Sequence, residues 1–246
     1  MKRFFLLALT LSLTAPAFAA IDESEILQPF TDEMALEMGM TPIEAVEKVK
    51  KGSGAPNVQR LIQENKVVIL VNKKASGPGA QTLKMYEEGV LTFETKVSTG
   101  TETPVTATSG RRYVRTTPVG HFRPVNIYTM YFSNTWKTDM PNAVFLVGGI
   151  AIHATPRDAA HQGMLGKRAS GGCVRVKLED SVKIRETVMN TGNGAGEGQF
   201  RTVTESHRRW RVTDTNRVTV PAIQRSNGAR TGAMMKSWDT VIVVHD

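Results

Sequence analysis

The strongest constraint on the fold is the pattern of residues 66–153, where short β-rich runs alternate with glycine and proline turns. Val67–Val71 is a run of aliphatic residues, and the turn Ser76-Gly77-Pro78-Gly79 follows it. Many short strands joined by such turns are typical of a sandwich or barrel. We therefore expect a mainly β, α+β fold: a β-sandwich whose last strand returns to the main sheet. The further expected strands are Gln81–Tyr86, Val90–Ser98, Asn126–Phe132, Ala143–His153 and Val241–Val244.

Helical patterns flank this region. Within residues 20–64, an amphipathic stripe recurs at spacings of three and four residues. Thr41-Pro42-Ile43-Glu44 is typical of a capping box with proline at the first helical position, and Asn57 is a candidate N-cap of a further helix. We expect an N-terminal helical segment at 20–64 that braces a main domain at 65–246, in which Leu178–Met189 forms a helix. The stripe consists of Ile26, Leu27, Phe30, Met34 and Met38.

The first 19 residues have the pattern of a secretory signal peptide. Lys2 and Arg3 precede an apolar stretch, and Ala17-Phe18-Ala19 matches a cleavage site. No other stretch approaches the roughly 18 apolar residues of a membrane span. The sequence therefore predicts export to the periplasm or cell wall, without stable insertion into the membrane.

Cys173 is the only cysteine of the chain, so it forms no intrachain disulfide. It lies in Ser170-Gly171-Gly172-Cys173-Val174-Arg175, and His153 follows a strand-like run twenty residues upstream. A lone cysteine is often a small buried hydrophobe. However, a nucleophilic thiolate needs a base, positive charge and backbone N–H donors, and this segment offers all three. We take Cys173 as the candidate nucleophile and His153 as its base.

A metal site is the main competing interpretation of a cysteine and histidine pair. The chain has five histidines, no H-E-x-x-H motif and no second cysteine, and the eight-residue spacing of His153 and His161 matches no zinc signature. A papain-like arrangement is also excluded, because there the cysteine precedes its histidine. We expect no metal and no organic cofactor. The remaining histidines are His121, His207 and His245.

The net charge of +8, from 31 basic and 23 acidic residues, favours a polyanionic partner. For an exported protein, anionic wall polymers are a better candidate than nucleic acid. An arginine-rich stretch at about 199–237, with Trp210 among its arginines, is expected to be an insertion into the main domain that forms a solvated hairpin. Its arginines are Arg201, Arg208, Arg209, Arg211, Arg217, Arg225 and Arg230.

Taken together, these motifs resemble the L,D-transpeptidase catalytic domain family (YkuD type) of bacterial cell-wall enzymes. Members carry a histidine after a strand and then Ser-His-Gly-Cys-hydrophobic-Arg; this chain has Ile152-His153-Ala154 and Ser170 to Arg175 in that order. Val97-Ser98-Thr99-Gly100, Thr117-Pro118-Val119-Gly120-His121-Phe122 and Leu165-Gly166 are further family-like marks. The resemblance covers roughly residues 66–190 and the last strand. The chain departs from the pattern at Gly171, where the family usually has histidine.

The resemblance implies a reaction on peptidoglycan stem peptides. His153 takes the proton of Cys173, and the thiolate attacks the bond before a terminal D-alanine, which leaves a thioester on Cys173. The backbone N–H groups of Gly172 and Cys173 would hold the oxyanion. Transfer to an amine of another stem gives a 3–3 crosslink, and a free D-amino acid gives exchange.

Other residues near the motif have two possible roles each. Arg175 either binds a substrate carboxylate or braces the loop, and Ser170 either bonds across the site or stabilises the turn. Tyr131 and Trp136 are candidates for lining the substrate groove, with core packing as the alternative. Gly171 adds backbone freedom that would help the loop present its N–H groups.

The sequence leaves the second half-reaction open. The alternatives to transfer are an L,D-carboxypeptidase or wall hydrolase on the same scaffold, in which water resolves the thioester, and a non-catalytic peptidoglycan-binding module. The oligomeric state is not indicated.

Overall fold

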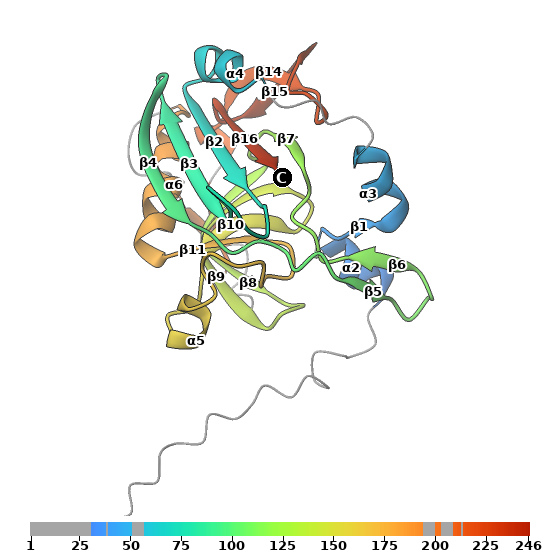
Figure 1. Ribbon diagram of the computed structural model, residues 1–246. Coiled ribbons are helices and arrows are strands. Elements are labelled where there is room, and N and C mark those ends of the chain that lie inside the picture. The colour runs from blue at the N-terminus through green and yellow to red at the C-terminus, as the bar shows by residue number, and fades with distance from the viewer. Residues whose placement is uncertain (1–30, 38, 51–56, 194–199, 203–208, 213) are drawn as a thin grey trace, which may run out of the picture.

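The structure is a computed structural model, and it describes residues 31–37, 39–50, 57–193, 200–202, 209–212 and 214–246 (Figure 1). The expected signal peptide and most of the first helical stripe lie outside these residues. The main body consists of two β-sheets, with α6 (Leu178–Asn190) at one side and the N-terminal helices with a small third sheet at the other (Figure 1).

The first sheet has five strands in the order β4-β3-β2-β16-β7. β16 runs parallel to β2, and the other neighbours are antiparallel. The final strand therefore lies beside the first expected strand, which confirms the predicted return to the main sheet. The bounds are β2 Val67–Asn72, β3 Thr82–Glu87, β4 Val90–Lys96, β7 Gly120–Phe122 and β16 Thr240–His245.

The second sheet has six strands in the order β11-β10-β9-β8-β13-β12, with β10 and β11 parallel. The single strand expected over Ala143–His153 is wrong, because the chain turns at Gly148 and Gly149 between β9 and β10. Gly148 has a φ of +52°, which glycine adopts without strain. The bounds are β8 Asn126–Ser133, β9 Thr138–Val147, β10 Ile150–Ala154, β11 Val174–Val176, β12 Phe200–Thr202 and β13 Trp210–Val212.

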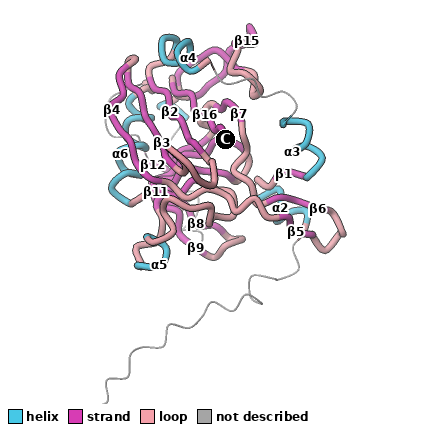
Figure 2. The backbone as a smooth tube through the Cα atoms, in the orientation of Figure 1, coloured by secondary structure: helices cyan, strands magenta, loops and turns pink. Residues whose placement is uncertain are grey.

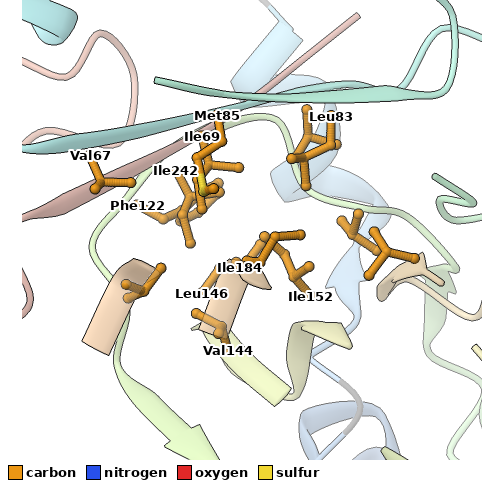
Figure 3. Packing of buried hydrophobic residues seen from close by; sticks show 14 of the residues in the cluster. Val67, Ile69, Leu83, Met85, Phe122, Val144, Leu146, Ile152, Ile184 and Ile242 are labelled. Carbon is orange, nitrogen blue, oxygen red and sulfur yellow. The ribbon is translucent and has the colours of Figure 1, made fainter. Parts of the chain in front are cut away.

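The core lies where these two sheets and α6 meet. Alternate residues of each strand point inward, as the period of two in a β-strand requires. Figure 3 shows Ile69, Met85 and Ile242 of the first sheet directed toward Leu146 and Ile152 of the second, with Ile184 of α6 beside them. Trp238, which precedes β16, is completely buried in the same cluster. The mainly β, α+β sandwich predicted from the sequence is confirmed.

The opposite face of the five-stranded sheet is covered by α4 (Val58–Glu64). Leu61 and Ile62 of α4 pack on Val68, Val241 and Val243, which are the outward members of the same alternation. Asn57 caps this helix as predicted, because its side chain accepts a hydrogen bond from the Arg60 N–H at 3.1 Å.

The described N-terminal residues pack on a small sheet of order β1-β6-β5. Asp32 of α2 accepts hydrogen bonds from the Tyr113 hydroxyl (2.6 Å) and the Ser109 hydroxyl (2.9 Å), which tie the helix to this sheet. The predicted position of Pro42 is wrong: it lies in β1 opposite Tyr113, and the helix begins one residue later. The bounds are α2 Asp32–Glu37, β1 Thr41–Pro42, α3 Ile43–Lys50, β5 Pro104–Thr106 and β6 Arg112–Val114.

The arginine-rich stretch is only partly the solvated hairpin expected. β14 (Val218–Ile223) and β15 (Arg230–Ser237) do form a two-stranded hairpin, but β13 is a member of the six-stranded sheet and buries Val212 in the core. The connection from β10 to β11 carries the short helix α5 (Ala159–Gln162), which is labelled in Figure 2. Arg208 lies outside the described residues. No helix in the described part of the chain is long and apolar enough to cross a membrane.

Candidate active site

The candidate site lies on the outward face of the six-stranded sheet, where β10 and β11 run side by side. His153 of β10 is opposite Arg175 of β11 in the parallel register, and Cys173 directly precedes β11. Because side chains alternate, Ile152 and Val174 enter the core while His153, Cys173 and Arg175 share the other face. The sheet thus brings together residues that are twenty positions apart in the sequence.

This face of the sheet forms the floor of an open pocket. Cys173, His153, Arg175 and Gly171 line it, together with Tyr131 and Trp136, which the sequence analysis also named. The other lining residues come from the β8–β9 hairpin and the turn before β10, and they were missed because a mixed polar hairpin gives no motif. They are Ser133, Asn134, Thr135, Thr138, Met140, Gly149 and Ile150.

His153 is buried and held in one orientation by its own strand. Its Nδ1 donates a hydrogen bond to the carbonyl of Ala154 at 2.7 Å, which leaves the lone pair on Nε2. Burial lowers the pKa of His153 to about 3, and the charge of Arg175 adds to this effect, while the bond to Ala154 opposes it. The imidazole is therefore neutral at physiological pH and able to accept a proton.

The thiol of Cys173 is also neutral at rest. Burial raises the pKa of Cys173, against the opposing effects of a backbone hydrogen bond from Ala151 and the charge of Arg175. Sγ lies 3.7 Å from the carbonyl oxygen of Gly149, a distance at which the thiol donates a weak S–H···O hydrogen bond. The positive surroundings inferred from the sequence are present, but desolvation outweighs them. Proton transfer to an acceptor must accompany attack by the sulfur.

Ser170 supports the turn that precedes the nucleophile. Its hydroxyl donates to the carbonyl of Cys173 (2.5 Å) and accepts from the N–H of Gly172 (3.0 Å). The role of the Gly172 N–H as an oxyanion donor stays a prediction, because in this structure Ser170 accepts its hydrogen bond. Gly172 permits the sharp turn, with a φ of +138°.

At Gly171 the indole of Trp136 fills the space that a side chain would need. A Cβ added at Gly171 would lie 2.5 Å from Cζ2 of Trp136, and the three nearest atoms all belong to that ring. The φ of Gly171 is not in the left-handed region. The role suggested for this glycine is therefore corrected: it provides room for Trp136 and not unusual backbone freedom. The family's motif histidine and this tryptophan compete for the same space.

Among the described residues that line the pocket, Arg175 has the only charged side chain. Its Nε is buried and has no hydrogen-bond partner among the described residues. A desolvated guanidinium N–H without a partner is costly.

Arginines also stack on both aromatic walls. The guanidinium of Arg209 lies 4.3 Å from the ring centroid of Tyr131, and that of Arg115 lies 5.9 Å from Trp136. Arg209 donates to the carbonyl of Phe132, which holds it beside the pocket. Within the described ranges, no three histidine, cysteine, aspartate or glutamate side chains come together in a way that could hold a metal ion.

The sequence comparison agrees with this geometry. The family model of the L,D-transpeptidase catalytic domain (YkuD) matches residues 66–229. The chain belongs to this family. The match includes the five-stranded sheet up to β7, the six-stranded sheet and the whole pocket, and it confirms the resemblance found in the sequence. No curated protein matches the sequence.

Solved structures with similar folds are L,D-transpeptidases. One from Xylanimonas cellulosilytica is 27% identical, with 48% of this chain and 52% of that chain covered and a TM-score of 0.38. One from Mycobacterium smegmatis is 14% identical, with 74% and 59% covered and a TM-score of 0.41. The L,D-transpeptidase LdtMt1, solved in complex with imipenem, is 15% identical, with 49% and 54% covered and a TM-score of 0.39. The alignments thus span little more than half of these proteins.

Proposed function

We propose that this protein is an exported cysteine L,D-transpeptidase that acts on peptidoglycan stem peptides. The observation that carries the proposal is the placement of Cys173, His153 and Arg175 on one face of β10 and β11, within one pocket. Membership of the L,D-transpeptidase family supports transpeptidase chemistry. The signal-like residues 1–19 and the net charge of +8 support export to an anionic wall in the periplasm or cell wall, with a role in wall biogenesis and cell shape.

The first half-reaction forms the acyl-enzyme. Nε2 of His153 takes the thiol proton as Sγ of Cys173 attacks the carbonyl carbon of the third stem residue. The C–S bond forms, the C–N bond to the terminal D-alanine breaks, and the leaving nitrogen takes the proton from His153. Because the pKa of the thiol is raised and that of the imidazole is about 3, transfer of the proton before attack is unfavourable, so the transfer accompanies formation of the C–S bond.

The second half-reaction resolves the thioester. An amine of a neighbouring stem attacks the carbonyl carbon, and His153 accepts its proton. The C–N bond forms, the C–S bond breaks, and Cys173 recovers the proton. A free D-amino acid in place of the stem gives exchange, and water gives the carboxypeptidase product.

In this proposal, Arg175 binds the carboxylate of the substrate. Its buried Nε has no hydrogen-bond partner, and the described residues that line the pocket include no aspartate or glutamate that would compete for the guanidinium. A stem peptide that ends in D-alanine carries a carboxylate next to the bond that breaks. A charge-assisted hydrogen bond from Arg175 would hold that end of the substrate.

The test is mass spectrometry of the purified protein incubated with a disaccharide tetrapeptide, with and without a free D-amino acid. We expect release of D-alanine and an adduct on Cys173, which is absent in the Cys173→Ala variant. Dimer, exchanged peptide or tripeptide then identifies the acceptor as a stem, a D-amino acid or water. Imipenem, the ligand of the solved LdtMt1 complex, serves as a second acylating probe. Folded protein that gives neither adduct nor product with either reagent would overturn the proposal.

A further inference from the structure

A buried threonine, Thr117, holds the turn that carries the nucleophile. Its hydroxyl accepts a hydrogen bond from the N–H of Gly100 at 2.9 Å and donates one to the carbonyl of Gly172 at 2.7 Å. The residue is fully buried. Because the Gly100 N–H can only donate, the direction of both bonds is fixed, and the hydroxyl proton points to Gly172.

The bond to Gly172 also sets the direction of the next amide. The Gly172–Cys173 peptide is trans, so its C=O and the N–H of Cys173 point to opposite sides. Thr117 holds the carbonyl against the buried residues behind the turn. The N–H of Cys173 is then directed away from Thr117.

Close packing around the turn leaves little room for another orientation. A Cβ at Gly172 would lie 3.0 Å from the carbonyl oxygen of Thr116, and one at Gly100 would lie 2.7 Å from the N of Thr117. Only glycine allows these three segments to approach so closely. The Gly172 N–H donates to Ser170 and the Gly172 carbonyl accepts from Thr117, so both backbone polar groups of Gly172 already have hydrogen-bond partners.

An ion pair with a buried lysine supports Thr117 from behind. Nζ of Lys73 donates to the carbonyl of Thr117 (2.9 Å) and pairs with the carboxylate of Glu102 (2.8 Å). Lys73 is 4% exposed, whereas the Glu102 side chain is 23% exposed and remains in contact with water. The adjacent Thr116 takes part in the same network, with its hydroxyl 2.9 Å from Glu102, but it has no bond to the Gly172 carbonyl.

We propose that the Thr117 hydroxyl is a positioning group for catalysis: it fixes the Gly172–Cys173 peptide so that the Cys173 N–H is the oxyanion donor of the acylation step. The proposal rests on the acyl transfer at Cys173 proposed above. The oxyanion forms only when the thiol adds to a carbonyl. Alkylation of the same thiol by iodoacetamide forms no oxyanion and does not need the donor.

The experiment compares the two reactions in Thr117→Val, which keeps the shape and removes the hydroxyl. We expect the maximal rate of acylation by imipenem to fall at least about tenfold, since loss of one oxyanion donor costs about 10²–10³. The apparent affinity for imipenem and the rate of alkylation by iodoacetamide should stay within about twofold of wild type. Thr117→Ser, which keeps the hydroxyl, should restore acylation.

Thr240→Val is the matched control, because it makes the same chemical change at an equally buried threonine, whose hydroxyl contacts that of Thr191 and not the turn. It should leave the acylation-to-alkylation ratio unchanged. If Thr117→Val does not fold, Thr117→Ala gives the same comparison with room for the backbone groups to relax. Equal acylation rates in wild type and a folded Thr117 variant, or a parallel loss of both reactions, would overturn the proposal. Failure of the wild-type protein to acylate would instead count against the proposed function.

Discussion

We predict that one added carbon at Gly171 destabilises the protein through Trp136, and that the effect disappears when Trp136 is truncated. The new Cβ would lie 2.5 Å from Cζ2 of the ring. Favourable contacts between carbons begin near about 3.5 Å, so the ring or the turn must shift by roughly 1 Å. Overpacking of this kind costs about 1–3 kcal/mol. Trp136 is 39% exposed, so its ring has room to move, which favours the lower half of that range.

The assay is a double-mutant cycle measured by urea unfolding. Gly171→Ala alone should lower the free energy of unfolding by about 1–2 kcal/mol, or the melting temperature by roughly 2–8 °C. In a Trp136→Ala background the same change should be neutral or stabilising by about 0.4–1 kcal/mol, because alanine restricts the unfolded chain. Trp210→Ala is the control, since Trp210 is equally exposed at 38% and is not among the nearest contacts of Gly171.

Gly171→His extends the same reasoning to the family motif. For an ordinary family member, histidine at this position would be tolerated or activating, because the family usually has histidine there. The structure predicts instead that it is tolerated only together with Trp136→Ala, which vacates the space. Additive effects of Gly171→Ala and Trp136→Ala, or full stability of Gly171→His alone, would refute the argument that the two side chains compete for one position.

Five other predictions concern the chemistry and the loop. Replacing His153 by glutamine should slow acylation by about 10²-fold or more, measured by the rate of adduct formation with imipenem. Burial raises the pKa of Cys173, so the thiol stays protonated up to that raised value. Its alkylation rate should therefore still rise with pH beyond about 8.5. A plateau near neutral pH would indicate that Cys173 and His153 form a thiolate–imidazolium ion pair. With the pKa of His153 at about 3, acylation should show no inflection near pH 6.5, and one there would mean that the base is not this buried imidazole. Arg175→Gln should raise KM about 10- to 100-fold for a peptide with a free C-terminal carboxylate and leave KM unchanged for the same peptide with a C-terminal amide. Equal effects on the two peptides would indicate that Arg175 braces the loop and does not bind the carboxylate. Gly172→Ala should cost about 1–3 kcal/mol of stability, because alanine does not adopt a φ of +138° without strain, and an unchanged melting curve would contradict that geometry.

The sequence by itself determined the class of fold, several of its strands and the candidate residues of the motif. Val67–Val71 and Val241–Val244 are aliphatic runs long enough to be recognised as buried strands, and both lie within strands of the five-stranded sheet. Cys173 and His153 were recognisable because the residue types that nucleophilic catalysis needs are few. Asn57 was recognised as an N-cap because capping depends on residues three positions apart.

Only the tertiary structure decided how distant segments meet. The parallel register of β10 and β11 sets His153 opposite Arg175, and the Trp136 ring lies in the space beside Gly171; neither relation has a local signal in the chain. The same holds for Thr117, whose bond to Gly172 joins residues 55 positions apart. The pKa directions of Cys173 and His153 also depend on the fold, because desolvation is set by what packs around a side chain and not by its neighbours in sequence.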